Sequence, residues 1–250
     1  MNFFDRFCRF YTTSKTSPFP HRLNGRYEAI IANNSDLFAG KRVLDIASHD
    51  GRWSFAALHA GASYVKGIEP RQELIDNAIE TFICYGISPT QYNFLCGDVF
   101  DLLDGEPFDI VFCLGFFYHT IRHAELLNLI DRTGANFIII DTEVTPASDQ
   151  LVSRENSDPR LIHGNPFEIQ LLRDPVDNPQ MACQDSLTRD GFTLVGRPSK
   201  AAVQYMSNHF GYSCDGYDWC SHFLKNPEQV SSMPDYDQGW RKTFYLSKRC

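Results

Sequence analysis

Three acidic residues stand at the end of a short apolar segment of the chain or shortly after it: Asp45, Glu69 and Asp98. If these segments are neighbouring parallel strands, the three carboxylates meet at one edge of a sheet, because the carboxyl ends of such strands lie side by side. A carboxylate there repels phosphate and attracts a positively charged group or a hydroxyl. The sequence therefore predicts a binding site for a cationic, hydroxyl-bearing ligand.

Tyr118 and His119 follow a fourth apolar segment, residues 108–115. Histidine exchanges a proton near neutral pH, so a histidine at a strand end is suited to general acid–base chemistry. We interpret His119 and Tyr118 as the candidate catalytic residues, with His119 as a general base. A structural histidine explains the same position about as well, since a reaction can rely mainly on positioning of the reactants.

An α/β fold would bring these residues together. Apolar segments alternate with helical patterns as far as residue 143, and each helical pattern closes near a glycine. Ser199 is placed to cap a later helix. We expect strands over 43–46, 64–69, 92–96, 108–115, 137–143, 212–217 and 242–247, with helices over 52–60 and 122–132 among those between them.

The segment from Val43 to Gly51 combines a strand, an acid, a tight turn and a helix start. It resembles the first motif of class I S-adenosylmethionine-dependent methyltransferases, an acid followed by three glycines at alternate positions. Here Ala47 and His49 replace two of those glycines and Gly51 remains. The resemblance implies a Rossmann-like three-layer α-β-α sandwich and S-adenosyl-L-methionine as cofactor. It also implies a seven-stranded, mostly parallel sheet of order 3-2-1-4-5-7-6, with the last strand antiparallel.

The same resemblance assigns roles to single residues. Glu69 corresponds to the acid that accepts hydrogen bonds from the ribose hydroxyls, and Asp98 and Val99 to the residues beside the adenine ring. An acid at a helix start explains Glu69 equally simply, and a helix N-cap explains Asp98. The remaining expected cofactor-binding residues are Asp45, Ala47, His49, Gly51, Trp53, Leu114 and Arg26. For Arg26, a solvated helix start is as good an explanation.

Two segments lie outside the alternating pattern. Residues 1–40 form an N-terminal helical segment that either packs on the main domain through its phenylalanines or acts as a lid, with a second helix expected over 29–38. Residues 41–250 form the methyltransferase domain. Within it, residues 144–198 show only weak periodicity, and we interpret them as an insertion that covers the substrate.

The bulk composition limits the partners. A net charge of −8 and a pI near 5.4 argue against DNA, and make RNA an unfavourable partner. No apolar run approaches a membrane span, and the charged N-terminus does not resemble a signal peptide. Eight scattered cysteines, with Cys96 and Cys113 in apparently buried strands, indicate reduced thiols in a cytoplasmic protein. We expect no metal, because Cys214, Cys220 and His222 match no ligand spacing.

The functional prediction is methyl transfer to oxygen or nitrogen of a small molecule. A second reading is a wobble-uridine tRNA carboxymethyltransferase-like enzyme, because the segments 50–55 and 114–119 resemble that branch. A third is a methyltransferase-like binding module without activity, which the histidine at position 49 favours. A nicotinamide-dependent oxidoreductase is disfavoured by the missing glycine motif. The sequence leaves the acceptor and the oligomeric state open.

Overall fold

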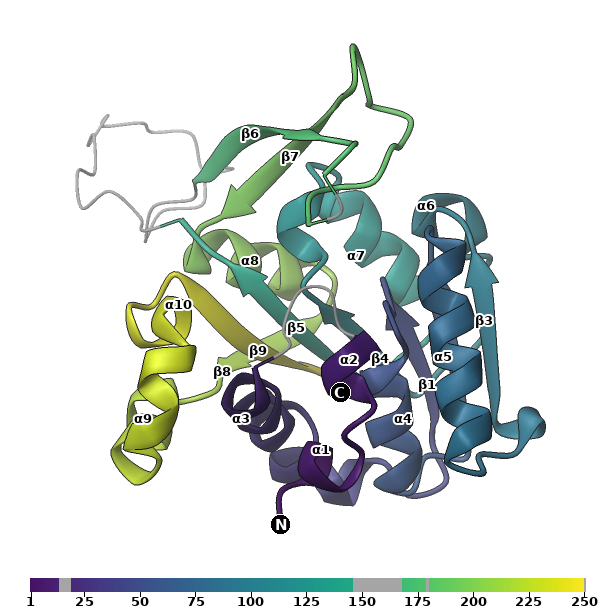
Figure 1. The fold of residues 1–250 in the computed structure, drawn as a ribbon. Helices are drawn as coiled ribbons and strands as arrows, with labels where there is room; N and C mark the ends of the chain where they lie inside the picture. Colours follow the sequence, from purple (N-terminus) through teal and green to yellow (C-terminus); the bar gives the residue numbers. More distant parts are fainter. Residues whose placement is uncertain (14–18, 146–167, 179, 250) are drawn as a thin grey trace, which may run out of the picture.

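The computed structural model describes residues 1–13, 19–145, 168–178 and 180–249. Five parallel strands and two antiparallel pairings build its main sheet. In spatial order the strands are β3 (Tyr92–Cys96), β2 (Tyr64–Glu69), β1 (Arg42–Ile46), β4 (Ile110–Leu114), β5 (Phe137–Glu143), β9 (Arg241–Lys248) and β8 (Tyr212–Gly216) (Figure 1). Counted within this sheet alone, the order is the predicted 3-2-1-4-5-7-6, and its last strand, β9, is antiparallel to both neighbours. The prediction of fold and topology is confirmed.

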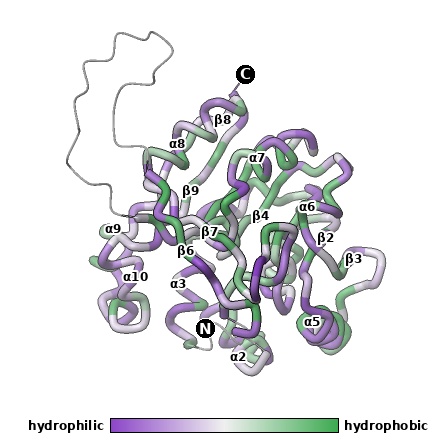
Figure 2. The backbone as a smooth tube through the Cα atoms, turned by 90° about the horizontal axis from the view of Figure 1, so that it is seen from above, coloured by the Kyte–Doolittle hydropathy of each residue, from purple (hydrophilic) through white to green (hydrophobic). Residues whose placement is uncertain are grey.

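Helices cover both faces of the sheet. The first face packs against α3 (Pro20–Ile30), α4 (Arg52–His59) and α5 (Gln72–Cys84), and the second against α7 (His123–Arg132) and α8 (Lys200–His209). Strand β4 shows why both faces are apolar. Its residues 110, 112 and 114 belong to the first core, while 111 and 113 belong to the second. A strand buried on both faces is therefore hydrophobic throughout, as Figure 2 shows for β4.

The N-terminal segment packs on the first face. Its helices α1 (Phe3–Arg6) and α2 (Phe10–Thr13) bury Phe4 and Phe10 against Trp53 and Phe55 of α4. The bounds predicted for the second helix, residues 29–38, are wrong. Helix α3 begins at Pro20 and ends at Ile30, and a 3-10 turn, η1 (Ala32–Leu37), follows. Proline suits the first helical position because its φ is already helical and no N–H partner is needed there.

The insertion contains more structure than its weak periodicity indicated. Strands β6 (Ile169–Pro175) and β7 (Phe192–Pro198) pair antiparallel as a separate two-stranded sheet, hereafter the hairpin. It stands above the edge of the main sheet at which the parallel strands end (Figure 1). His123 of α7 lies within 3.1 Å of the carbonyl of Gly196 and so ties the hairpin to the domain. Residues 146–167 of the insertion lie outside the described residues.

The connection between β8 and β9 was expected only as a long link. It contains α9 (Trp219–Lys225), the 3-10 turn η4 (Pro227–Ser232) and α10 (Pro234–Asp237). Trp219, Phe223, Met233 and Tyr236 form a third apolar cluster against Ala29 of α3. This packing brings Asp235 and Tyr236 to the end of β5, where they take part in the site described below.

The short elements that remain are α6 (Val99–Leu102), η2 (Pro89–Gln91) and η3 (Phe117–His119). Cys113 is buried as expected, but Cys96 is exposed, because β3 is an edge strand. In the described ranges no group of three His, Cys, Asp or Glu side chains is arranged to hold a metal. None of the helices described combines the length and the apolar character that a bilayer crossing requires.

Candidate active site

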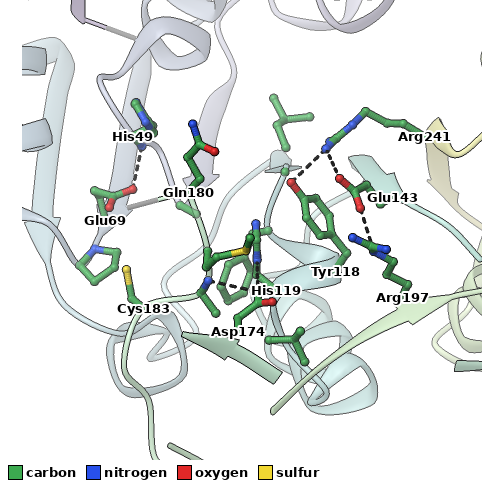
Figure 3. A pocket seen from close by; sticks show the side chains of 18 of the residues that line it. His49, Glu69, Tyr118, His119, Glu143, Asp174, Gln180, Cys183, Arg197 and Arg241 are labelled. Carbon is green, nitrogen blue, oxygen red and sulfur yellow. Dashed lines mark hydrogen bonds and ion pairs between the residues drawn. The ribbon is translucent and has the colours of Figure 1, made fainter. Parts of the chain in front are cut away.

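A cavity of about 420 Å³ opens at the carboxyl edge of the parallel strands. Its loop side comprises the loop after β1, the end of β2, and α3, and the smaller pocket described next extends this side to the end of β3. Its hairpin side comprises the ends of β4 and β5, the hairpin and β9 (Figure 3). A smaller pocket adjoins the cavity, and the two share five lining residues: Ala47, Pro70, Phe116, His119 and Cys183.

The loop after β1 keeps a glycine-type backbone without the glycines. Ala47 and His49 have φ values of 54° and 56°, in the left-handed region that costs an L-residue roughly 1 kcal/mol, and Gly51 has a φ of 72°. The backbone N–H of Ser48 donates to Ile68 at 3.0 Å, and that of Gly51 to Ser48 at 2.9 Å. These bonds hold the loop in this conformation, with Ala47 and His49 in a backbone region that glycine adopts without strain.

Gly51 has a packing role and does not line either cavity. A Cβ at this position would lie 2.9 Å from Phe94, 3.0 Å from Ala78 and 3.1 Å from Phe82. The helix start can therefore approach β3 and α5 only with glycine here. Gly51 thus acts on the site indirectly, by setting where α4 begins.

His49 and its neighbours form a buried polar group beneath the loop. Arg52 donates from Nε to Asp50 at 2.6 Å and contacts Nδ1 of His49 through Nη2 at 2.8 Å. Thr13 of α2 also donates to Asp50, at 2.7 Å. Burial and the charge of Arg52 lower the pKa of His49, so its ring is neutral. Although burial alone would raise the pKa of Asp50, Arg52 and His49 hold it well below its usual range.

Asp45 lies under the loop and outside the lining of both cavities. Its Oδ2 accepts hydrogen bonds from the backbone N–H of Ser54 at 3.2 Å and from the Ser54 hydroxyl at 2.7 Å, which fixes the first turns of α4. Burial raises the pKa of Asp45 to about 7. The structure thus gives Asp45 a role in positioning α4, and a direct contact with a cofactor remains a prediction.

Glu69 lines the main cavity at the end of β2. Its two carboxylate oxygens accept from the backbone N–H of His49 at 3.0 Å and from Nε of Arg71 at 2.6 Å. Oε1 also accepts from the backbone N–H of Arg71 at 3.2 Å, so Oε2, with one bond, is the oxygen that keeps a lone pair, because a carboxylate accepts about four hydrogen bonds. Glu69 is therefore held in place by the loop and can still accept bonds from a ligand hydroxyl.

Asp98 and Val99 line the smaller pocket. Oδ1 of Asp98 accepts from the backbone N–H of Phe100 at 3.0 Å, so Asp98 is the N-cap of α6, as the alternative reading expected. Burial raises the pKa of Asp98. Capping occupies one oxygen only, so the two readings of this residue are compatible. Of the other predicted residues, Arg26, Ala47, His49, Trp53 and Leu114 all line the main cavity.

His119 is paired with an acid that the sequence did not single out. Its Nδ1 lies 2.9 Å from Oδ2 of Asp174 in β6, and the backbone N–H of Ala182 donates to the same oxygen at 3.2 Å. Burial alone would raise the pKa of Asp174, but the contact with His119 lowers it. A carboxylate at Nδ1 accepts a hydrogen bond from the Nδ1–H group, and this tautomer leaves Nε2 as the basic nitrogen. His119 and Asp174 therefore have the arrangement that a histidine needs to act as a general base through Nε2.

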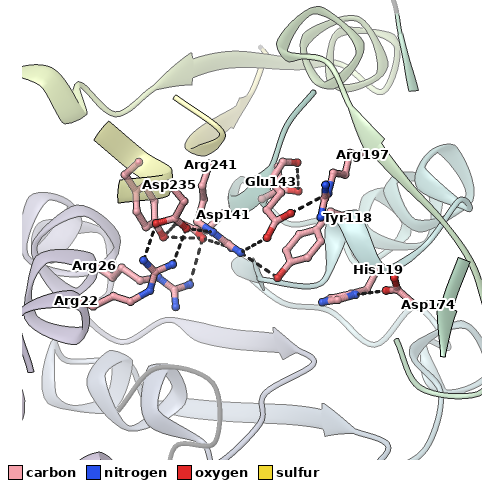
Figure 4. Close-up of polar contacts among 12 residues, drawn as sticks. Arg22, Arg26, Tyr118, His119, Asp141, Glu143, Asp174, Arg197, Asp235 and Arg241 are labelled. Atoms are coloured by element: carbon pink, nitrogen blue, oxygen red, sulfur yellow. Dashed lines mark hydrogen bonds and ion pairs between the residues drawn. The ribbon is translucent and has the colours of Figure 1, made fainter. Parts of the chain in front are cut away.

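A network of arginines and acids continues from Tyr118 to α3 (Figure 4). Arg241 donates to the Tyr118 hydroxyl at 2.9 Å, to Glu143 at 3.3 Å, to Asp141 at 3.1 Å and to Asp235 at 2.9 Å. Asp141 is fully buried at the end of β5 and also accepts from Arg26, Tyr236 and Thr243. Although burial alone would raise the pKa of Asp141, Arg26 and Arg241 keep it low.

Three residues of this side were not predicted: Asp174, Arg197 and Arg241. Asp174 and Arg197 come from the hairpin, and Arg241 begins β9. The alternation of Thr193, Val195 and Arg197 with their neighbours was the available signal, because period-two alternation indicates a half-buried strand. No local signal separates Arg241 from an exposed arginine, since all its hydrogen-bond partners except Asp235 lie about a hundred residues or more away in the sequence.

Comparison with known proteins decides the family. Residues 43–134 match the family described as "Methyltransferase domain". Residues 43–134 thus carry a methyltransferase domain, on a sheet with the class I strand order. This domain is 29% identical, over 47% of the chain and 50% of the relative, to a protein named "Ubiquinone biosynthesis O-methyltransferase" from Neisseria meningitidis serogroup C (strain 053442). A second protein of that name, from N. meningitidis serogroup A / serotype 4A (strain DSM 15465 / Z2491), is 31% identical over 40% of the chain and 41% of its own length. The chain thus spans half or less of these curated relatives.

Solved structures share the fold of the methyltransferase domain. The N-terminal domain of EvdMO1, crystallised with SAH and D-fucose, has a TM-score of 0.60 at 16% identity, with 89% of this chain and 82% of that chain covered. The DhpI-SAM-HEP complex has a TM-score of 0.57 at 16% identity, with coverage of 98% and 95%. A putative S-adenosylmethionine-dependent methyltransferase from Listeria monocytogenes has a TM-score of 0.61 at 13% identity, with coverage of 93% and 100%. At these identities the likeness is one of fold.

Proposed function

We propose that this chain is an S-adenosylmethionine-dependent methyltransferase that acts on an oxygen or nitrogen of a small molecule. The observation that carries the proposal is the placement of His119 and Asp174 in the cavity that Glu69 and the loop after β1 also line. A ligand bound along the loop side would present its reactive end to a general base. The family match of residues 43–134 and the SAM and SAH complexes of structural neighbours support the same cofactor.

The residues of the loop side fit this cofactor. The smaller pocket, with Asp98 and Val99, suits the adenine ring, and Glu69 suits the ribose hydroxyls. Arg26 suits the carboxylate of the methionine part, because its Nε has no partner in the described part of the chain and only Nη2 donates, to Asp141 at 3.2 Å. Trp53, whose ring lies 5.0 Å from the Arg26 guanidinium, holds that side chain in place.

The hairpin side would perform the chemistry. The cofactor supplies a methyl group on a positively charged sulfur. Asp174 holds the His119 ring through Nδ1, and Nε2 of His119 takes the proton of the acceptor hydroxyl or amine. The acceptor atom freed of that proton would take the methyl group, and the cofactor would leave as the neutral thioether. Leu172 and Val195 of the hairpin cover this part of the cavity and limit its water.

The size and cover of the cavity favour a small acceptor. A volume of about 420 Å³ lies within the range of ordinary small-molecule sites, and it must hold both ligands. The described part of the insertion, residues 168–178 and 180–198, contributes residues between Leu172 and Arg197 to its lining, so we assign these described residues as the acceptor cover. The N-terminal segment 1–40 contributes Arg22 and Arg26 to the lining. It therefore acts as part of the cofactor site, whether or not it also moves as a lid.

The test has two steps. Purified protein is heated with SAM, with SAH and with ATP as a nucleotide control, and SAM or SAH is expected to raise Tm where ATP does not, because a ligand that binds only the folded state stabilises it. Methyl transfer from isotope-labelled SAM is then measured on a panel of small phenols, hydroxy acids and amines, with bulk tRNA as a separate arm. Absence of any shift with SAM and SAH would overturn the proposal, and transfer to tRNA alone would overturn the small-molecule assignment.

A further inference from the structure

Among the arginines that line the hairpin side, Arg197 donates the fewest hydrogen bonds within the described residues. It stands on the cavity-facing row of β7, opposite Gln170 in the register and two residues after Val195. Its Nε lies 2.8 Å from Oε2 of Glu143, but the angle does not make a hydrogen bond. Its two terminal nitrogens have no hydrogen-bond partner in residues 1–13, 19–145, 168–178 and 180–249. The side chain is 39% exposed, although it lines the cavity.

Arg241, on the same side, is the opposite case. All three of its nitrogens contact acids, and the tyrosine hydroxyl of residue 118 takes a further bond. It also contacts Glu143, so the acid that pairs with Arg197 is already shared with a second guanidinium, while Asp174 faces Arg197 at longer range. Arg241 is thus a structural cation that fixes Glu143 (Figure 4), and Arg197, which lines the cavity, keeps two terminal nitrogens as available donors.

The wall around Arg197 indicates what those donors would meet. Tyr118, Leu172 and Val195 give an apolar wall, and the His119–Asp174 pair lies on the same side of the cavity. A guanidinium fork matches a carboxylate in shape and charge, and forms two parallel hydrogen bonds with it. The cationic cofactor of the proposed function adds positive charge beside this wall, which favours an anionic second ligand.

Resting on the proposed function, we propose that the methyl acceptor carries a carboxylate, which the terminal nitrogens of Arg197 bind. Its body packs on Tyr118, Leu172 and Val195, and its hydroxyl or amine lies at Nε2 of His119. The acceptor is therefore a small hydroxy or amino acid with an apolar body. In the reaction, the acceptor loses one proton to His119 and gains one methyl group, and its carboxylate is unchanged.

The test measures binding to the SAH-loaded protein, so that it does not depend on finding the natural acceptor. The probes are 3-hydroxybenzoate and 3-hydroxybenzamide, which differ only in the charged group. Affinities are measured by calorimetry for the wild type, for Arg197→Gln and Arg197→Lys, and for Arg173→Gln. Arg173 is a matched control, because it lies on the same hairpin outside the cavity lining, with its guanidinium 4.5 Å from the Phe192 ring.

The wild type is expected to bind the acid about tenfold more tightly than the amide, the ratio that one charge-assisted bond gives. Arg197→Gln should reduce the ratio to within about twofold, Arg197→Lys should restore part of it, and Arg173→Gln should leave it unchanged. Three outcomes would overturn the proposal: the acid binds no better than the amide, it shows no saturable binding at millimolar concentration, or the ratio is unchanged in Arg197→Gln. Failure of SAH itself to bind would count instead against the proposed function.

Discussion

The loop side and the hairpin side of the cavity are built from different ranges of sequence. The loop side comes largely from residues 47–71 and 97–99, where each functional residue follows its own strand within a few positions. The hairpin side joins residues 114–119 with residues 141–143, 172–197 and 235–241. The first is a local device of the parallel sheet, whereas the second exists only after the hairpin and the antiparallel strand β9 have been added to it.

This difference has an energetic side. The loop side is held mainly by backbone N–H groups, such as those of Ser48 and His49, which bond to carbonyl and carboxylate oxygens. The hairpin side is held by ionised side chains around the buried Asp141. Removal of Asp141 would leave the charges of Arg26 and Arg241 without a compensating acid. We expect the two sides to respond differently to substitution: reactivity and stability depend on single residues of the hairpin side, while changes in the loop have smaller effects.

The largest effect is expected at the general base. His119→Gln removes the nitrogen that accepts the proton and keeps a polar side chain of similar reach. We expect kcat to fall by about 10²–10⁴-fold. The dissociation constant of SAH, measured by calorimetry, should change by less than about threefold. His209→Gln changes an exposed histidine of α8 and serves as the control. If kcat of His119→Gln stays within tenfold of wild type, positioning alone carries the reaction.

The next effect concerns the stability of the hairpin side. Asp141→Ala leaves Arg26 and Arg241 buried beside a missing acid, and the loss of one partner of a buried pair destabilises a protein by about 3–5 kcal/mol. Urea unfolding should show this loss. Glu80→Ala is the comparison, because Glu80 pairs with Arg9 near the surface, and a pair of that kind contributes about 0–1 kcal/mol. Equal losses in the two variants would contradict the contrast between the sides.

The loop side was predictable for the same reason that it is local. Strand, acid, turn and helix follow one another between Val43 and Trp53, so sequence spacing fixes their places in space. Asp45 was the exception. Its contact with the cofactor stays a prediction, whereas the structure shows it accepting hydrogen bonds from Ser54 of α4, a role that spacing alone did not indicate.

The hairpin side could be predicted only in part. Tyr118 and His119 were found because they follow a strand, whereas Asp174, Arg197 and Arg241 depend on pairings across 54 to 123 positions. Contacts of that separation arise from packing of the insertion and of α10, which local patterns do not encode. The alternation in β7 was a usable signal, but the exposed Leu194 on its outer row obscured which face is covered.

Asp45 provides a pH test of the loop side. Its pKa is about 7 in the folded chain, against 3.8 for the unperturbed group, because burial disfavours the charged form. A group with a raised folded-state pKa contributes stability that is complete below about pH 4 and is lost as the pH rises toward 7. Asp45→Asn cannot ionise and still offers a carbonyl to Ser54. The difference in unfolding free energy between Asp45→Asn and wild type should therefore shift in favour of the variant by a few kcal/mol as the pH rises from 4 to 8.

Urea unfolding of Asp45→Asn at several pH values provides this comparison, with Asp36→Asn as the exposed control. A difference between Asp45→Asn and wild type that stays constant over the whole range would mean that Asp45 is ionised in the folded chain. Its carboxylate would then have to be compensated by a neighbour, and its place among the cofactor-binding residues would be strengthened.

The smallest effect tests whether the loop tolerates its missing glycines because tertiary contacts fix it. Ala47 has a φ of 54°, so Ala47→Gly relieves about 1 kcal/mol of backbone strain and loses about 0.4–1 kcal/mol through the greater freedom of the unfolded chain. The net change should lie between zero and a gain of about 0.5 kcal/mol. Ala60 ends α4 at a φ of −82°, where alanine is unstrained, so Ala60→Gly should lose about 0.5–1 kcal/mol. The sign of the difference between the two variants, from urea unfolding, is the decisive quantity. A loss at position 47 as large as at position 60 would mean that the alanine methyl packs favourably, and that this chain has replaced the glycine with a contact of its own.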